Sequence, residues 1–201
     1  MEELVSARRE QILDAARDLI VRDGFAGASM HAIARAAGLT RPALYAEFGD
    51  RDELFAALVD REERRVLDMA MASMPELPPD ADPAEFAVRL ADAYLDLVLS
   101  MPQSVRFVLM PAEGAPSGTS ERVERGKAEV RARSKALITM AAALQEREVD
   151  AELLSHAAFS VSETAARLVL EPDRDDSREA VSKTLRWLAR RTVSAAPEKR
   201  G

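Results

Sequence analysis

Apolar side chains recur with the helical period along nearly the whole chain. No segment alternates apolar and polar residues in the manner of a half-buried strand, and the Asn-Gly pair that marks a tight hairpin is absent. The hydrophobic pattern therefore predicts an all-α protein. The first predicted helix, over residues 6–23, carries one apolar stripe made of Ile12, Ala15, Ala16, Leu19 and Ile20.

Glycines and capping residues divide the next part of the chain into short helices. Gly24 ends the first helix, and Gly38 ends a second helix that begins after Ser29. Thr40 is suited to cap a third helix, and Pro42 fits the first turn of that helix because its missing N–H costs little there. Two short helices joined by such a tight turn form the helix-turn-helix layout, which places its second helix in the major groove of DNA.

The rest of the chain predicts longer helices. Asp50 and Glu53 form a capping-box-like pair at the start of a long fourth helix. Prolines between residues 75 and 83 mark a stiff connector, and residues 111–120 form a loop rich in Pro, Gly, Ser and Thr. From the third onward, the helices are expected over residues 41–48, 51–74, 84–100, 102–110, 121–148, 151–171 and 177–195.

These elements predict two domains with about nine helices in all. Residues 1–50 are expected to form an N-terminal three-helix helix-turn-helix domain. Residues 51–201 are expected to form a larger helical domain for ligand binding and dimerisation.

Composition excludes several classes of protein. The 201 residues include no cysteine, which removes disulfides, cysteine metal sites and thiol chemistry together. Apolar residues make up 47% of the chain, which is enough for a packed core. No apolar run approaches the roughly 20 residues that span a membrane. The charged N-terminus lacks an apolar secretory segment, so we expect a cytoplasmic protein with no membrane partner.

The net charge of −7 argues against a protein that coats nucleic acid without specificity. A specific reader needs positive charge only locally, and six arginines stand against eight carboxylates up to residue 50. We therefore expect affinity for DNA to come from a few placed contacts and from two half-sites acting together. Non-specific binding should be moderate, and salt should weaken it strongly.

One set of residues in the first quarter of the chain keeps a constant spacing without a gap. The set is Ile12–Leu13–Asp14–Ala15–Ala16, Gly24–Phe25, Ser29, Ile33–Ala34, Ala37–Gly38–Leu39, Leu44–Tyr45, Phe48 and Leu54–Phe55. With this set the chain resembles the tetracycline-repressor (TetR) family of bacterial transcription regulators. The resemblance implies a homodimer that binds a palindromic operator in double-stranded DNA, represses transcription, and is released by a small-molecule effector.

The resemblance also implies DNA contacts at named positions. Ser29 and Thr40 match positions that cap helices and touch phosphates. Tyr45 matches a tyrosine whose hydroxyl commonly meets the DNA backbone. Arg51 stands where the family usually has a lysine, at a helix N-terminus that suits a phosphate. Base edges are usually read at the positions of Arg41, Pro42 and Ala43.

Glu47 departs from the family pattern. The family often has an aromatic residue or a histidine between the tyrosine and the phenylalanine, whereas this chain reads Tyr45–Ala46–Glu47–Phe48. A carboxylate beside phosphates is repulsive unless it accepts a hydrogen bond from a cytosine amino group or pairs with an arginine. Both possibilities stay open, and Glu47 remains among the candidate DNA-contacting residues.

Large and pliant apolar residues behind the fourth helix are candidates to line an effector pocket. Methionine adapts to varied ligands, and Tyr94 adds a polar group. We therefore expect a small, largely apolar effector and no bound cofactor or metal. The candidate pocket residues are Met69, Phe86, Tyr94, Met101, Phe107 and Met110.

The last two long helices carry the stripes that predict a dimer surface. A face with small residues suits close helix packing, and two such helices from each subunit form a four-helix contact. Ordinary core packing within one subunit is the alternative for the same stripes. The candidate interface residues are Leu154, Ala157, Ala158, Val161, Ala165, Val181, Leu185 and Leu188.

An enzyme and a helical scaffold built on a degenerate regulator fold are the two other classes of function. The chain has no nucleophile elbow, no phosphate-binding glycine motif, and no histidine and carboxylate cluster with metal-ligand spacing. We therefore favour a regulator over an enzyme. A DNA band shift that needs Tyr45 and Arg51 separates a regulator from a scaffold, and turnover of a small molecule would favour an enzyme.

Overall fold

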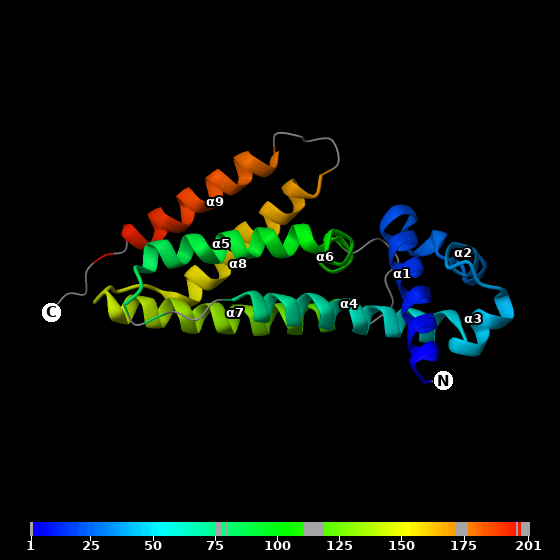
Figure 1. Cartoon of the computed structure of the whole chain (residues 1–201). Coiled ribbons are helices and arrows are strands. Elements are labelled where there is room, and N and C mark those ends of the chain that lie inside the picture. Colours follow the sequence, from blue (N-terminus) through cyan, green and yellow to red (C-terminus); the bar gives the residue numbers. More distant parts are fainter. Residues whose placement is uncertain are drawn as a thin grey trace. The chain divides into compact units, whose positions relative to one another are not determined.

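The computed structural model describes residues 2–74, 78, 80–110, 119–171, 177–195 and 197. Within these residues the chain forms nine helices, in the order that the sequence predicts, so the all-α fold class is confirmed (Figure 1). Residues 111–118 of the predicted loop, and Pro75 and Pro79 of the predicted connector, lie outside the described residues. The helices are α1 (Glu2–Gly27), α2 (Met30–Ala36), α3 (Arg41–Glu47), α4 (Arg51–Ser73), α5 (Pro83–Ser100), α6 (Pro102–Leu109), α7 (Thr119–Leu144), α8 (Ala151–Val169) and α9 (Ser177–Ser194).

The helices divide between two compact units. The first unit contains residues 1–66 and 103–124, and the second contains residues 67–102 and 125–201. The first unit therefore includes the N-terminal part of α4 and nearly all of α6, in addition to the first fifty residues. No helix in the described part of the chain is long and apolar enough to cross a membrane.

The core of the first unit forms where the apolar stripe of α1 meets the short helices. Of the predicted stripe, all but Ala15 is buried. The rings of Phe25 and Phe55 meet edge to face with their centroids 5.3 Å apart, and the ring of Phe107 in α6 lies 6.1 Å from that of Phe25. This core holds α1, α2, α3 and the start of α4 together. Its fully buried large residues are Ile12, Ile20, Ile33, Leu44, Phe48, Leu54 and Leu58.

Gly24 interrupts the helical geometry of α1. Its backbone has φ 72° and ψ 173°, a combination that is essentially restricted to glycine. The predicted end of the first helix at Gly24 is thus a break, after which the chain makes one more turn to Gly27. The break turns the chain so that Phe25 enters the core, where it is buried.

A buried cluster of charges joins α1 to α4 within the first unit. Glu62 of α4 is fully buried and accepts hydrogen bonds from the guanidinium of its neighbour Arg61. Arg61 reaches across to α1, where it donates to Glu10 at 2.8 Å and to Asp14 at 2.9 Å. Arg17 of α1 lies 3.8 Å from the Glu62 carboxylate. The cluster therefore fixes how α4 packs against α1.

In the second unit, α5 and α9 run side by side and α8 packs against both (Figure 1). Leu95, Ala165 and Leu185 form the buried centre of this unit, with one residue from each of α5, α8 and α9. At the surface, Arg186 pairs with Asp92 at 2.7 Å and Arg190 pairs with Glu85 at 2.7 Å, so two ion pairs also join α9 to α5. Lys127 of α7 pairs with Glu163 of α8 at 2.8 Å, and Lys135 pairs with Glu152 at 2.6 Å.

Candidate nucleic-acid interface

The helix-turn-helix consists of α2, a turn over residues 37–40, and α3. Gly38 has a φ of 66° in this turn, which is the left-handed region that favours glycine. The turn is closed by backbone hydrogen bonds from Ala37 to Ile33 at 2.8 Å and from Leu39 to Ala34 at 2.8 Å. Leu44 is the buried residue of α3, so the opposite side of that helix faces outward.

Ser29 and Thr40 cap the two short helices, as predicted. The hydroxyl oxygen of Ser29 accepts from the backbone N–H of Ala32 at 3.2 Å, and that of Thr40 accepts from Ala43 at 3.4 Å. Both capping residues are exposed. Each hydroxyl still carries a hydrogen that it can donate, because a hydroxyl is both an acceptor and a donor.

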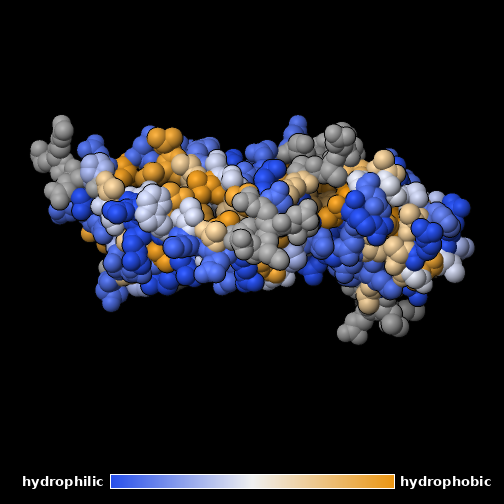
Figure 2. Space-filling model, turned by 90° about the horizontal axis from the view of Figure 1, so that it is seen from above, coloured by the Kyte–Doolittle hydropathy of each residue, from blue (hydrophilic) through white to orange (hydrophobic). Residues whose placement is uncertain are grey.

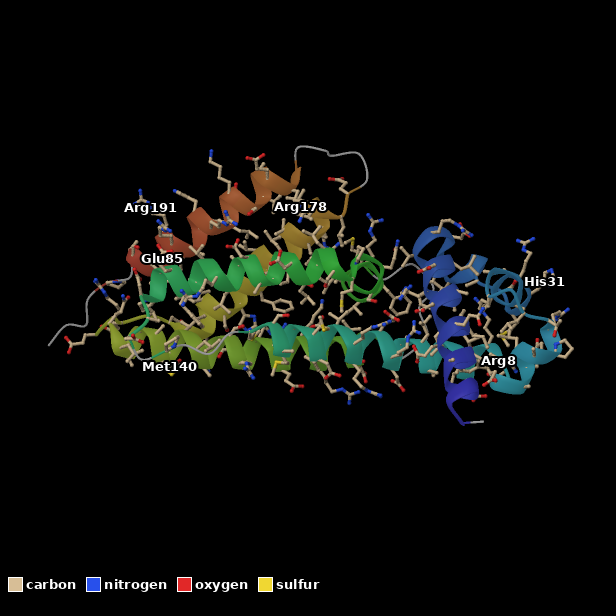
Figure 3. All side chains as sticks on the ribbon, viewed as in Figure 1. Arg8, His31, Glu85, Met140, Arg178 and Arg191 are labelled. Carbon is tan, nitrogen blue, oxygen red and sulfur yellow. The ribbon has the colours of Figure 1, made fainter. Side chains whose placement is uncertain are left out.

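The residues expected to read DNA lie on the outward side of α3. Arg41 and Pro42 are exposed in its first turn, and Tyr45 is 44% exposed one turn later. Ala43 is half-buried beside them. On α2, His31 projects outward on the same unit (Figure 3).

Glu47 faces α1. Its side chain is only 8% exposed, and its carboxylate lies 3.9 Å from the guanidinium of Arg8. Arg8 lies near the start of α1, where Figure 3 labels it. Of the two possibilities that the sequence left open for this carboxylate, the structure shows pairing with an arginine.

Arg51 has a partner inside the first unit. Its guanidinium donates a hydrogen bond to the carbonyl oxygen of Phe25 and lies over the ring of Phe55, 4.7 Å from the ring centroid. Around it, the predicted capping pair is present: Asp50 accepts from the backbone N–H of Glu53 at 2.8 Å, and Glu53 accepts from that of Gly49 at 2.8 Å. Arg51 therefore ties the start of α4 to the chain just after the Gly24 break.

The six residues predicted to line a pocket are divided between the two units. Met69, Phe86, Tyr94 and Met101 belong to the second unit, whereas Phe107 and Met110 belong to the first. The hydroxyl of Tyr94 donates to the backbone carbonyl of Ser162 at 2.7 Å, so it is engaged within the fold. Burial, and then the nearby carboxylate of Glu163, raise the pKa of Tyr94 above its usual range.

The eight residues predicted to form a dimer surface fall into two groups. Ala165 and Leu185 are buried in the centre of the second unit and Val181 packs against them, so these three serve the core of one subunit. Ala157, Ala158 and Val161 are exposed on α8, while Leu154 and Leu188 are half-buried. Trp187 of α9, which lies off the predicted stripe, is exposed as well. Figure 2 shows apolar surface on the face of the second unit that carries α9.

The polar residues of α1 that contact α3 were missed from the sequence. Adjacent arginines on a helix ordinarily indicate a solvated face, and nothing in the spacing of Arg8 and Arg9 indicates that they reach a helix about forty residues further along the chain. The signal lies only in the tertiary structure, in which Arg9 donates to the carbonyl oxygen of Glu47 at 3.0 Å.

Comparison with known proteins places this site in one family. The model of the bacterial regulatory proteins of the tetR family matches residues 12–58, which contain α2, α3 and the start of α4. The HTH-type transcriptional regulator Rv1255c of Mycobacterium tuberculosis is 30% identical over 182 residues, which cover 87% of this chain and 83% of that protein.

A second relative matches over a shorter region. The HTH-type transcriptional repressor SCO4008 of Streptomyces coelicolor is 32% identical over 115 residues, or 57% of this chain. The match covers 54% of that protein, so the chain spans about half the length of this relative. Both relatives are named as transcriptional regulators rather than enzymes.

Solved structures agree with the fold. A TetR-like transcriptional regulator from Rhodococcus sp. RHA1 superposes with a TM-score of 0.73 at 27% sequence identity. The superposition covers 93% of this chain and 96% of that one, so the similarity includes the helices behind the helix-turn-helix.

Proposed function

The chain belongs to the TetR family of DNA-binding transcriptional regulators, and we propose that it is a homodimeric repressor of transcription. In this proposal residues 1–50 read a palindromic operator in double-stranded DNA. Residues 51–201 bind the second subunit and a small, largely apolar effector that releases the operator. The protein acts in the cytoplasm and uses no cofactor.

The observation that carries the proposal is the outward side of α3. Arg41, Pro42 and Tyr45 are exposed together on a helix that Thr40 caps and Leu44 fixes to the core. An exposed, rigidly held helix of this kind fits the major groove, where an arginine can read a base edge.

Phosphate contacts flank these reading residues. The exposed hydroxyls of Ser29 and Thr40 have a hydrogen free for a phosphate oxygen after capping their helices. Arg51 has five N–H donors, and the bond to Phe25 uses one of them, so donors remain for a phosphate of the DNA backbone.

Two subunits are required because a palindromic site has two equivalent halves. The two helix-turn-helix domains of a dimer fit one face of DNA when they are about 34–36 Å apart, which is one helical turn of DNA. The exposed apolar residues of α8 and α9, including Val161 and Trp187, support a dimer surface on these helices. An effector that changes this spacing would lower operator affinity. A coupling free energy of about 1–3 kcal/mol between the effector site and the operator site corresponds to a loss of about 5–150-fold.

Selection of bound duplexes from a random DNA pool tests the proposed function. We expect the selected sites to have dyad symmetry, with half-sites about 10 base pairs apart from centre to centre. A variant with Arg41→Ala and Tyr45→Phe is the control and should enrich no such site. A pool without enrichment, or one enriched in single half-sites, would contradict the proposal. Repeating the selection with candidate effectors identifies compounds that release the DNA.

The dimer surface makes a separate prediction. Val161→Glu places a charge on each side of a two-fold contact, so we expect the dimer dissociation constant to rise about 10–100-fold. Sedimentation velocity over a dilution series measures this shift. Met140→Glu is the matched control, because Met140 of α7 is 42% exposed against 39% for Val161 and lies outside the proposed surface (Figure 3). Equal dissociation constants for the two variants would place the dimer contact elsewhere.

A further inference from the structure

We propose that Arg9 of α1 is a positioning residue for operator recognition, which holds the C-terminal end of α3 and so sets the direction in which α3 presents its reading residues. The inference rests on the proposed function and goes beyond it, because Arg9 lies outside the residues that face DNA.

The contacts of Arg9 converge on the end of α3. One guanidinium nitrogen donates to the carbonyl oxygen of Glu47, the last residue of the helix, at 3.0 Å. The guanidinium carbon lies 4.1 Å from the centroid of the Phe48 ring, and that ring is fully buried. The last carbonyls of a helix have no partner within it and form the negative end of its dipole. A cation at this place therefore supplies both the missing donor and the favourable charge.

Arg8 of α1 also contacts Glu47. The guanidinium of Arg8 lies 3.9 Å from the Glu47 carboxylate, whose side chain is largely buried. Two successive residues of α1 thus contact the backbone and the side chain of Glu47. Since α3 has only seven residues, it is too short to be stable by itself and depends on such tertiary contacts.

Gln11 of α1 contacts the end of α2, just before the turn that leads to α3. Its side-chain amide donates to the carbonyl oxygen of Ala37 at 2.8 Å, and Ala37 is the C-cap of α2. The turn that begins there leads directly to Thr40, which caps α3. The N-terminal half of α1 therefore contacts the main chain on both sides of the recognition residues, at the end of α2 and at the end of α3.

This geometry distinguishes Arg9 from a phosphate contact. The Arg9 guanidinium is half-buried and directed to the Glu47 carbonyl and the Phe48 ring. Loss of a positioning residue should weaken the specific complex, in which α3 must align with base edges. Loss of a phosphate contact weakens specific and non-specific complexes alike and reduces the salt dependence of binding.

Arg9→Met tests the inference, because methionine keeps the apolar stem and removes the donors and the charge. Arg22→Met is the matched control: Arg22 is exposed on the same helix, and its described ion pair is with the neighbouring Asp23. We expect Arg9→Met to bind the selected operator about 10-fold more weakly than Arg22→Met, with equal affinities for a scrambled duplex of the same length. Arg9→Lys should recover part of the loss because it keeps the charge.

Two results with DNA would overturn the inference. One is equal operator affinity of Arg9→Met and Arg22→Met. The other is a slope of log affinity against log salt that is shallower for Arg9→Met by about 0.9 per subunit, which would make Arg9 a direct phosphate contact.

Amide hydrogen exchange tests the same inference without DNA. The N–H of Phe48 donates to the carbonyl oxygen of Leu44 at 3.0 Å and reports on the end of α3. Its exchange should be several-fold faster in Arg9→Met than in Arg22→Met, while amides in the middle of α1 are unchanged. Equal exchange at Phe48 would overturn the inference. If the parent chain selects no duplex, the proposed function fails, and the exchange measurement still decides whether Arg9 holds the end of α3.

Discussion

Replacing Glu62 with alanine is expected to lower the free energy of unfolding of the first unit by about 3–5 kcal/mol. Glu62 is fully buried, and its carboxylate is the shared partner of Arg61 and Arg17, whose side chains are only 12% and 13% exposed. Removal of one partner from a buried ion pair is strongly destabilising. Arg61 keeps Glu10 and Asp14 as partners and Arg17 keeps Asp14 and Asp18, so their charges stay partly compensated. Among the residues that the structure describes, one carboxylate oxygen of Glu62 has no hydrogen-bond partner, which also puts the expected loss at the lower end of the range.

Urea unfolding followed by circular dichroism measures the change. Glu62→Gln keeps the shape and one acceptor, so it should lose only about 1–2 kcal/mol. Arg65→Ala is a control from the same helix: Arg65 is exposed and lies 3.9 Å from Asp14 at the edge of the cluster. An exposed pair of this kind contributes about 0–1 kcal/mol. If Glu62→Ala were no less stable than Arg65→Ala, the cluster would not support the packing of α4 on α1.

Arg41→Ala is expected to weaken operator binding by about 2–6 kcal/mol for the dimer. An arginine that reads a guanine contributes about 1–3 kcal/mol, and the substitution is present in both halves of the dimer. Arg41 is exposed in the first turn of α3, where a side chain reaches base edges most directly. Titration of a labelled operator at fixed salt concentration measures the loss.

The pattern of the loss identifies what Arg41 contacts. A base contact predicts relaxed specificity at one position of each half-site, which selection with the variant would detect. A phosphate contact predicts a uniform loss across sequences and a smaller salt slope. Arg22→Ala removes the same charge far along α1 and is the control for long-range electrostatics. If Arg41→Ala and Arg22→Ala bound the operator equally, Arg41 would have no place in the interface.

The local features of the fold were predictable because each depends on a few adjacent residues. Ser29 and Thr40 cap α2 and α3, Asp50 caps α4, and Gly38 takes a backbone conformation that other residues avoid. In each case the residue type satisfies a backbone group, or a φ value, within four positions of itself. Helix order and most helix bounds follow from the same local chemistry.

Contacts between distant parts of the chain were not predictable in this way. The side chain of Glu47 faces α1 because Arg8 is there, and Arg51 bonds to Phe25, which lies 26 positions earlier. Arg51→Ala is therefore expected to disturb the first unit as well as a phosphate contact, so Arg51→Lys is the better variant for a binding test. Hydrophobic periodicity places a residue on a helix face but does not identify the element that covers that face.

The second unit shows the same limit of the sequence pattern. Ala165 and Leu185 lie on stripes that suit a dimer surface, and both are buried against Leu95 within one subunit. In the first unit, Phe107 has the size and character of a pocket residue, and its ring lies 6.1 Å from that of Phe25. Apolar side chains serve a core, a pocket or an interface equally well, so their type does not separate these roles.

The hydrogen bonds from α1 to the main chain of the helix-turn-helix have a consequence for changing the DNA sequence that the protein binds. Gln11 and Arg9 bind main-chain carbonyl oxygens at residues 37 and 47, and every amino acid supplies such an oxygen. The outward residues between these two anchors can therefore be exchanged as a cassette without loss of either hydrogen bond. A regulator of this kind can acquire a new DNA target through substitutions at its recognition residues alone, while the main-chain contacts that orient α3 stay the same.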